Sequence, residues 1–465
     1  MFEDYINSNG DKIVNDLIEL INIKTVNDMK KPNMPYGEGV YKGLKYILDK
    51  GNSWKFKTQN YLGHCGHIEA GNGEYTIGIL CNVDVPEPVK QWTKNPFLGE
   101  VNDGKIYGLG ARTTKGSLIA CLYAMKILSD EGLIPEDKKI RLLLGCDKYK
   151  DGKSINYYKE YEGAPEIGFS PDGVFPVIYG EKGIIDLTLK MRVPCDYEAP
   201  INIVEISGGK KGQGVPDKVN MILSCEEIFK IKIEEELKAF AQEEGLEYKI
   251  ITQNKLVWIE LQGKSARSCN PEDGVNAISY GMKFLGRFEE VMDRKALIDE
   301  YEKLISTTYH GERINCNFKG DESGEFTFNV EEIKVDSEGA TIMVNITHPI
   351  SYLYTEVLEQ VKDGFKYTNL KIDSIDHARP ITFSKDSFVV KKLLKAYRDV
   401  TGDKESEPYT MAEKSFARAI SNTIAFGPVF PTEAKEELSS KEYISIENLF
   451  KLVEIYARGL IELMK

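Results

Sequence analysis

Three charged residues that could carry chemistry stand at the ends of short apolar runs. Asp84 ends the run 75–84, Lys148 follows the run 139–145, and Asp172 closes a third strand-like run. Short, mostly apolar runs are typical of strands buried in the middle of a sheet. Open α/β sheets bind ligands beyond the carboxyl ends of such strands. We therefore expect chemistry beyond the ends of these strands.

A glycine-containing loop, 107–116, leads into a strongly apolar helix pattern. Glycines at 108, 110 and 116 allow the backbone to turn tightly after a strand. Apolar residues then recur close to every 3.6 positions, at Leu118, Ile119, Leu122, Met125, Ile127 and Leu128. This spacing predicts a helix with an apolar stripe packed on a sheet.

The same loop carries the sequence Arg112-Thr113-Thr114-Lys115. Arg112 and Lys115, together with Lys148 and Arg267, could make a basic cleft for a small anionic ligand. The alternative is that Arg112 and Lys115 are solvated or paired with acidic side chains.

Histidines and cysteines offer weaker candidates. The run His64-Cys65-Gly66-His67 has the residue types of a metal clip but lacks two further ligands, so surface or structural roles are favoured. Cys81 and Cys146 end strands and could be nucleophiles, but no histidine base is placed beside them. The eight cysteines are scattered, and we expect reduced, buried thiols.

Composition bounds the class of protein. The chain has 465 residues, 42% of them hydrophobic, and a formal net charge of -13. The length predicts two or more domains. The negative charge argues against nucleic-acid and anionic-membrane partners. No apolar run is long enough to span a membrane and Met1–Asp4 is not the start of a signal peptide, so we expect a cytoplasmic protein.

Strand and helix patterns change twice along the chain. Buried strands alternate with helices as far as residue 182, and this pattern returns from 380, which indicates an α/β sheet. Between 183 and 379 the strands alternate polar and apolar residues, as in an α+β domain with helices on one sheet face. We therefore predict an α/β domain formed by 1–182 and 380–465, interrupted by an inserted α+β domain.

Landmarks in matching order give the chain a family resemblance. They include Asp103-Gly104-Lys105-Ile106-Tyr107-Gly108-Leu109-Gly110, Gly168-Phe169-Ser170-Pro171-Asp172, Gly263-Lys264-Ser265-Ala266, and Phe430-Pro431 through Glu442-Tyr443. In these the chain resembles, over nearly its full length, the bacterial co-catalytic metallo-dipeptidases of the PepV type, within the aminoacylase and carboxypeptidase-like superfamily. The resemblance implies a zinc-exopeptidase-like α/β domain, a mixed sheet with helices on both faces, and an inserted lid domain.

Members of this family hold two metal ions with histidines and carboxylates, and a glutamate acts as general base on metal-bound water. The resemblance places other residue types at these positions. The base position carries Lys148, Asp84 keeps the position that orients a histidine, and the metal-ligand positions carry Asn82, Thr113, Tyr149, Asp172 and Leu438. Of these ligand positions, only Asp172 keeps a carboxylate. We therefore expect no metal, and we expect a Lys148–Asp pair in place of the cations.

The lid departs from the family in the same way. Arg267 replaces a transition-state histidine, and Thr347 stands where an arginine would bind the substrate carboxylate, although Arg418 fits the family pattern. The favoured hypothesis is a catalytically inactive, monomeric family member with a binding or regulatory role, holding a peptide or small anionic ligand in an interdomain cleft. The alternatives are an active zinc- or manganese-dependent dipeptidase with a remodelled metal site, and a partner subunit of an active homologue.

Overall fold

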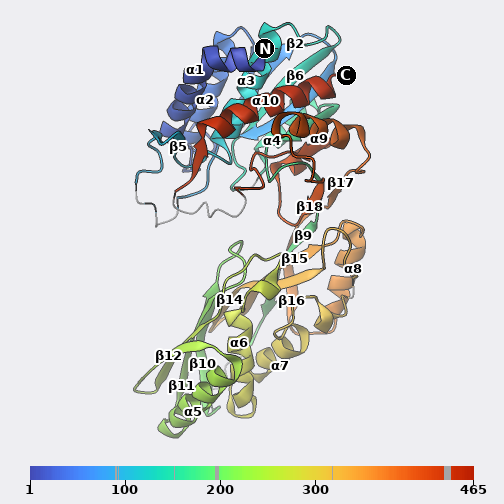
Figure 1. Ribbon diagram of the computed structural model, residues 1–465. Coiled ribbons are helices and arrows are strands. Elements are labelled where there is room, and N and C mark those ends of the chain that lie inside the picture. Colours follow the sequence, from blue (N-terminus) through green and yellow to red (C-terminus); the bar gives the residue numbers. More distant parts are fainter. Residues whose placement is uncertain (89–91, 93, 151, 194–197, 317, 434–440) are drawn as a thin grey trace. The chain divides into compact units, whose positions relative to one another are not determined.

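The chain folds into two compact units. The computed structural model describes residues 1–88, 92, 94–150, 152–193, 198–316, 318–433 and 441–465. The first unit comprises 1–179, 383–409 and 415–465, and the second comprises 180–382 and 410–414 (Figure 1). The main transitions fall within a few residues of the expected boundaries at 182 and 380. The return of 410–414 to the second unit has no counterpart in the sequence patterns.

A mixed sheet forms the centre of the first unit. Its strands β3, β6, β7 and β19 run parallel, whereas β1 and β2 are antiparallel to their neighbours. The order across the sheet is β1 (Lys57–Tyr61), β2 (Cys65–Gly71), β6 (Lys138–Gly145), β3 (Tyr75–Asn82), β7 (Ile167–Ser170) and β19 (Thr423–Ala425), followed by β8 (Ile178–Glu181), within which the chain enters the second unit.

Helices cover both faces of this sheet, as expected. Leu80 of β3 packs with Ile155 of α4 (Ser154–Glu162), while the next residue, Cys81, contacts Cys121 of α3 (Lys115–Asp130). Successive strand residues point to opposite faces, so α3 and α4 lie on different sides. The remaining helices of this unit are α1 (Phe2–Asn22), α2 (Glu38–Ser53), α9 (Phe388–Thr401) and α10 (Ile446–Leu463).

Helix α3 is more buried than its pattern suggested. Thirteen of its sixteen residues are buried, not a single stripe. The reason is that α1 and α10 pack against α3 on the side away from the sheet (Figure 1). Ser445 is the N-cap of α10, and its Oγ accepts a hydrogen bond of 3.0 Å from the N–H of Asn448.

The parallel strands bring the candidate site residues to one edge. In the register of β3 and β6, Asn82 pairs with Gly145, so the two strands end side by side. Strand β7 runs parallel to β3 and ends at Ser170. The segments that follow these three strands, which carry Asp84, Lys148 and Asp172, therefore leave the sheet at the same edge.

A small three-stranded sheet brings the C-terminal part of the chain to the loop before α3. Strand β20 (Tyr443–Ser445) pairs with β5 (Lys105–Tyr107), which also pairs with β4 (Glu100–Asn102). Glu442 immediately precedes β20, and this pairing carries it to residues 108–113.

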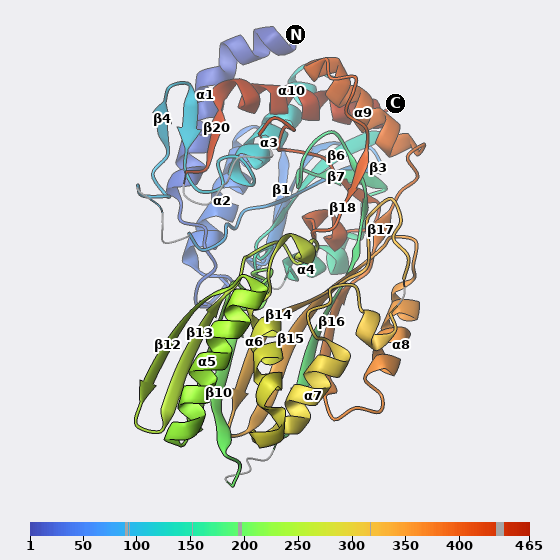
Figure 2. The ribbon, with the colours of Figure 1, turned by 60° about the horizontal axis from the view of Figure 1, so that its bottom comes forward.

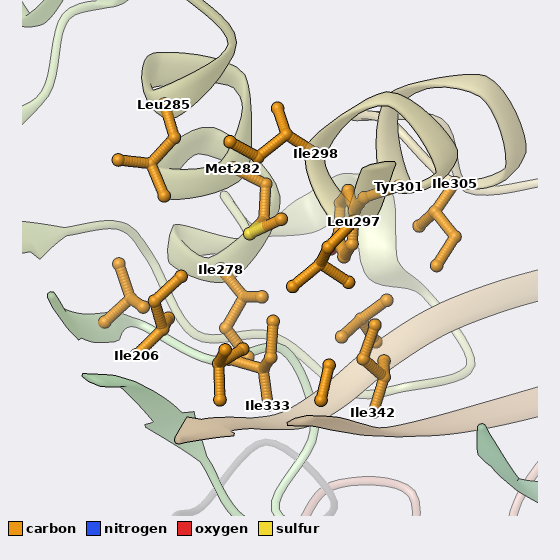
Figure 3. Packing of buried hydrophobic residues seen from close by; sticks show 14 of the residues in the cluster. Ile206, Ile278, Met282, Leu285, Leu297, Ile298, Tyr301, Ile305, Ile333 and Ile342 are labelled. Atoms are coloured by element: carbon orange, nitrogen blue, oxygen red, sulfur yellow. The ribbon is translucent and has the colours of Figure 1, made fainter. Parts of the chain in front are cut away.

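The second unit is an antiparallel sheet covered on one face, as predicted. Helices α5 (Glu227–Glu244), α6 (Ala277–Leu285) and α7 (Lys295–Leu304) lie along that face (Figure 2). Ile278 and Met282 of α6 meet Ile333 and Ile342 of the sheet in a dry core (Figure 3). Helix α8 (Tyr354–Gly364) adds Val357 to this core.

Eight strands make up this sheet. In order across it they are β12 (Glu247–Gln253), β13 (Leu256–Gln262), β11 (Lys218–Cys225), β10 (Ile201–Gly209), β14 (Thr327–Asp336), β15 (Gly339–His348), β9 (Gly183–Met191) and β16 (Lys371–Ala378). Among the described residues of the whole chain, no helix is both long and apolar enough to span a bilayer.

Candidate functional site

An ion pair joins the segments that follow β6 and β7. The Nζ of Lys148 lies 2.8 Å from Oδ1 of Asp172, and the two side chains are 15% and 20% exposed. Oδ2 of Asp172 accepts a hydrogen bond of 2.5 Å from the N–H of Phe416. Both carboxylate oxygens of Asp172 are therefore engaged. The expected pair of Lys148 with an aspartate is present, and its partner is Asp172.

Lys148 stays protonated in this environment. Burial alone would lower the pKa of its ammonium group, but the charge of Asp172, with Tyr149 and Asp84 nearby, raises that pKa above the ordinary value. A protonated ammonium has no lone pair with which to accept a proton. In this state Lys148 is unsuited to the role of the glutamate base, whose position the family resemblance gives to it.

Asp84 is a fully buried anchor for the segment after β6. Its carboxylate accepts hydrogen bonds from Nδ2 of Asn82 (3.1 Å), Nδ2 of Asn27 (3.1 Å) and the N–H of Tyr149 (3.0 Å). Its side chain has no exposed surface, and burial raises the pKa of this carboxyl above its usual range. Asn82, at the position where the resemblance places a ligand histidine, donates to Asp84 through its side-chain amide.

The hydroxyl groups of the two threonines in the loop before α3 both have hydrogen-bond partners. Oγ1 of Thr113 donates to Oε1 of Glu442 at 3.0 Å. Oγ1 of Thr114 lies 3.3 Å from the Tyr149 hydroxyl. Through Tyr149, whose N–H reaches Asp84, the loop is joined to the segments that follow β3 and β6.

Arg112 and Lys115 do not line a cleft, contrary to the basic-cleft expectation. Lys115 has no exposed surface, and its Nζ donates to the carbonyls of Ile23 (2.8 Å) and Ile21 (3.4 Å). Burial lowers the pKa of this ammonium to about 7, an effect that Glu442 opposes. Arg112 is only 3% exposed, and its Nη1 donates to the carbonyl of Glu433. Both side chains are structural.

The other predicted residues are divided between the two units. Arg418 is half-buried in the short helix η4 (Phe416–Ala419). Arg267 belongs to the second unit, where it is exposed and pairs with Glu413 at 2.5 Å. Thr347 is buried in the second unit and bonds the hydroxyl of Thr327 at 2.7 Å. Leu438 lies outside the described residues.

The histidines of the run 64–67 have separate aromatic partners. His64 stacks on Tyr157 with ring centroids 3.7 Å apart, and its Nδ1 lies 3.3 Å from the Tyr36 hydroxyl. His67 is buried in β2 beside Tyr61 and Tyr158. Within the described part of the chain, no three side chains of His, Cys, Asp or Glu are arranged to hold a metal ion.

His67 gives a pH prediction. Burial and the charge of Arg141 lower its pKa to about 4, so the folded state excludes a proton that the unfolded chain binds below about pH 6.5. Stability is therefore lost as the pH falls from about 6.5 toward 4. Between about pH 7 and 5 the wild type should lose about 2 kcal/mol relative to His67→Phe, as measured by urea unfolding. His377→Phe, at an exposed position, is the control and should match the wild type; an equal pH dependence in His67→Phe would contradict the prediction.

The family follows from comparison with known proteins. The sequence profile of Peptidase family M20/M25/M40 matches residues 83–462. The chain belongs to this family. It is 30% identical over 464 residues to the “Putative dipeptidase YtjP” of Bacillus subtilis, covering 97% of each chain. A relative of the same description in Staphylococcus saprophyticus is 29% identical and covers 100% of this chain and 99% of its own.

Solved structures of the M20 family share the fold. The yeast di-peptidase Dug1p superposes with a TM-score of 0.57 at 12% identity, covering 100% of this chain and 98% of its own. The M20 family metallo-carboxypeptidase Sso-CP2 of Sulfolobus solfataricus gives a TM-score of 0.57 at 16% identity, covering 97% and 99%. The fold and the PepV-type dipeptidase resemblance are thus confirmed. The names of the relatives favour the hydrolase alternative over the inactive hypothesis.

The residues of this M20 chain do not fit the family's two metal ions. Asn82 directs its Nδ2 to Asp84, Thr113 donates to Glu442, and Lys148 places a cation against Asp172. A metal ion needs several anionic or imidazole donors with free lone pairs. At these described positions an ammonium group and hydrogen-bond donors stand in their place.

Two residues that organise the site carry no sequence signal for that role. Glu442 stands in a family landmark, and nothing in that landmark indicates that its side chain binds the loop that carries Thr113. Asn27 lies 57 positions from Asp84 in the chain, and no pattern links the two residues. A buried carboxylate such as that of Asp84 needs hydrogen-bond donors, but the sequence does not show which residues supply them.

Proposed function

We propose that this M20 chain is a non-hydrolytic member of the dipeptidase branch, with a binding or regulatory role toward a peptide or small anionic ligand. The observation that carries the proposal is the Lys148–Asp172 pair: a charged ammonium occupies the base position and engages the one carboxylate left among the described ligand positions. Without a proton acceptor and a donor set for metal, water at this edge of the sheet has no activating group.

A metal-dependent dipeptidase with a remodelled site is the second candidate. Full-length similarity to relatives described as dipeptidases favours it. In that case Asp172 and Asp84 would be the carboxylates available to a zinc or manganese ion, and the ion would have to displace Lys148 from Asp172.

Metal content and hydrolysis, measured together, separate the two candidates. We expect chain purified in the presence of zinc and manganese to retain substoichiometric metal by mass spectrometry. We also expect it to hydrolyse no dipeptide at a rate above the metal-only blank. An active family member prepared in parallel is the positive control. Two tightly bound equivalents with turnover would overturn the proposal and establish the second candidate.

A further inference from the structure

Glu442 is held by a ring of donors at the start of α3. Its Oε2 accepts from the N–H of Gly110 at 2.7 Å. Its Oε1 accepts from the N–H of Arg112 (3.1 Å) and from both the N–H (3.1 Å) and the hydroxyl (3.0 Å) of Thr113. With a residue exposure of 4%, this carboxylate is almost entirely removed from water.

The loop has the chemistry of an anion site. Backbone N–H groups that converge on one point form a concave nest for an anion. The N–H groups of Gly110, Arg112 and Thr113 converge in this way, whereas that of Ala111 donates to the carbonyl of Gly108. Helix α3, which begins at Lys115, adds the positive end of its dipole. Gly110 makes the turn possible because its φ is 83° and a Cβ there would lie 2.8 Å from Cγ1 of Val85. The four donors match the two oxygens of a carboxylate.

The carboxylate that fills the nest comes from a distant part of the chain, and β20 holds it in place. The N–H of Gly108 donates to the carbonyl of Glu442 at 3.0 Å, and Tyr443 pairs with Tyr107. More than 300 positions separate Glu442 from the loop. The Glu442 side chain therefore binds the loop as a ligand from another part of the chain would, and it does not belong to the turn itself.

We propose that the loop 110–113 is a binding site for a small carboxylate, closed by Glu442 as its intramolecular occupant. The site takes a free monocarboxylate when Glu442 is withdrawn or replaced. Because Thr113 and Thr114 lie on this loop and Thr114 reaches Tyr149, occupation of the nest also orders the edge that carries Lys148 and Asp172. This proposal is independent of whether the chain hydrolyses peptides.

Chemical rescue tests the proposal. Glu442→Ala in the full chain should lower the midpoint of thermal unfolding by about 5 °C, because four donors lose their acceptor. Sodium formate should restore at least half of that loss, whereas sodium chloride at the same concentration should not. The wild type should show no formate-specific shift, since its nest is filled. Equal responses of the wild type and Glu442→Ala to formate would overturn the proposal.

Two further variants define the site. Glu442→Ala/Thr113→Val removes the hydroxyl donor and should require about fivefold more formate for the same recovery. Glu447→Ala, which removes an exposed carboxylate paired with Lys451, is the matched control and should behave as wild type. Formate recovery that is unchanged by the loss of the Thr113 hydroxyl would place the anion elsewhere and overturn the assignment.

A neutral occupant keeps the test decisive if Glu442→Ala does not fold. Glu442→Gln fills the nest with an amide oxygen and retains the shape of the side chain. Hydrogen exchange of the amides of Gly110, Arg112 and Thr113 should then be faster than in the wild type and insensitive to formate, because a neutral acceptor binds these donors more weakly. Unchanged exchange at these amides would overturn the role of the carboxylate.

Discussion

Replacing Lys148 with methionine is expected to lower the free energy of unfolding by about 3 kcal/mol, because the substitution leaves Asp172 charged in a mostly buried position. Among the residues that the structure describes, the N–H of Phe416 would then be the remaining hydrogen-bond partner of the Asp172 carboxylate. Urea unfolding at neutral pH measures the loss. If zinc or manganese held Asp172 instead, the same substitution would stabilise the metal-loaded chain.

The complete double-mutant cycle distinguishes an ion pair from simple packing. Lys148→Met/Asp172→Asn removes both charges and should recover most of the loss, since no uncompensated charge remains. Lys45→Met, which breaks an exposed pair with Asp49, is the control and should leave the free energy of unfolding unchanged. Additive losses in the double variant would contradict the pair as the source of the effect.

Asp84→Ala is expected to lower the free energy of unfolding by about 3 to 4 kcal/mol. It leaves the amide of Asn27 and the N–H of Tyr149 without their acceptor in a buried place. Asn82 keeps one bond, to the carbonyl of residue 84. Urea unfolding measures the loss, and hydrogen exchange should show faster exchange at Tyr149.

Asp84→Asn separates charge from shape. The amide of the new asparagine retains one acceptor oxygen, but its NH2 group faces one of the groups that donate to Asp84. The free energy of unfolding of Asp84→Asn should therefore lie between those of the wild type and Asp84→Ala. Asp49→Ala, at an exposed site, is the matched control and should unfold as the wild type does. If Asp84→Ala unfolds like the wild type, Asp84 does not anchor the segment after β6.

The central strands of the first unit could be predicted because short apolar runs in the sequence mark where each strand ends. The apolar runs that end near Asp84, Lys148 and Asp172 are β3, β6 and β7, and their parallel register brings those residues to one edge. Strands with weaker alternation, such as β10 and β14, escaped prediction. Each of these strands contains a bulge, between Ile203 and Glu205 in β10 and between Val330 and Glu332 in β14, which interrupts the alternation of polar and apolar residues.

The pairing of charges in the site could be predicted from the sequence, but the hydrogen bonds between distant segments could not. Loss of carboxylates at the family positions indicated that Lys148 would pair with an aspartate, and the geometry agrees. The burial of Lys115 was not visible, because a lysine that reaches the carbonyl of Ile23 has the same sequence signature as one in water. Contacts across long sequence separations, such as Thr113 to Glu442, depend on the folded topology.

The double use of Asp172 couples the positions of the candidate site to one another. One oxygen accepts from Lys148 and the other accepts from the N–H of Phe416. Thr113 likewise donates to Glu442, so an aspartate at position 113 would set a second carboxylate against that of Glu442. A single substitution toward the ligand set that the family resemblance implies would therefore break an existing bond or crowd two carboxylates. Several positions would have to change together to rebuild this site without such a loss.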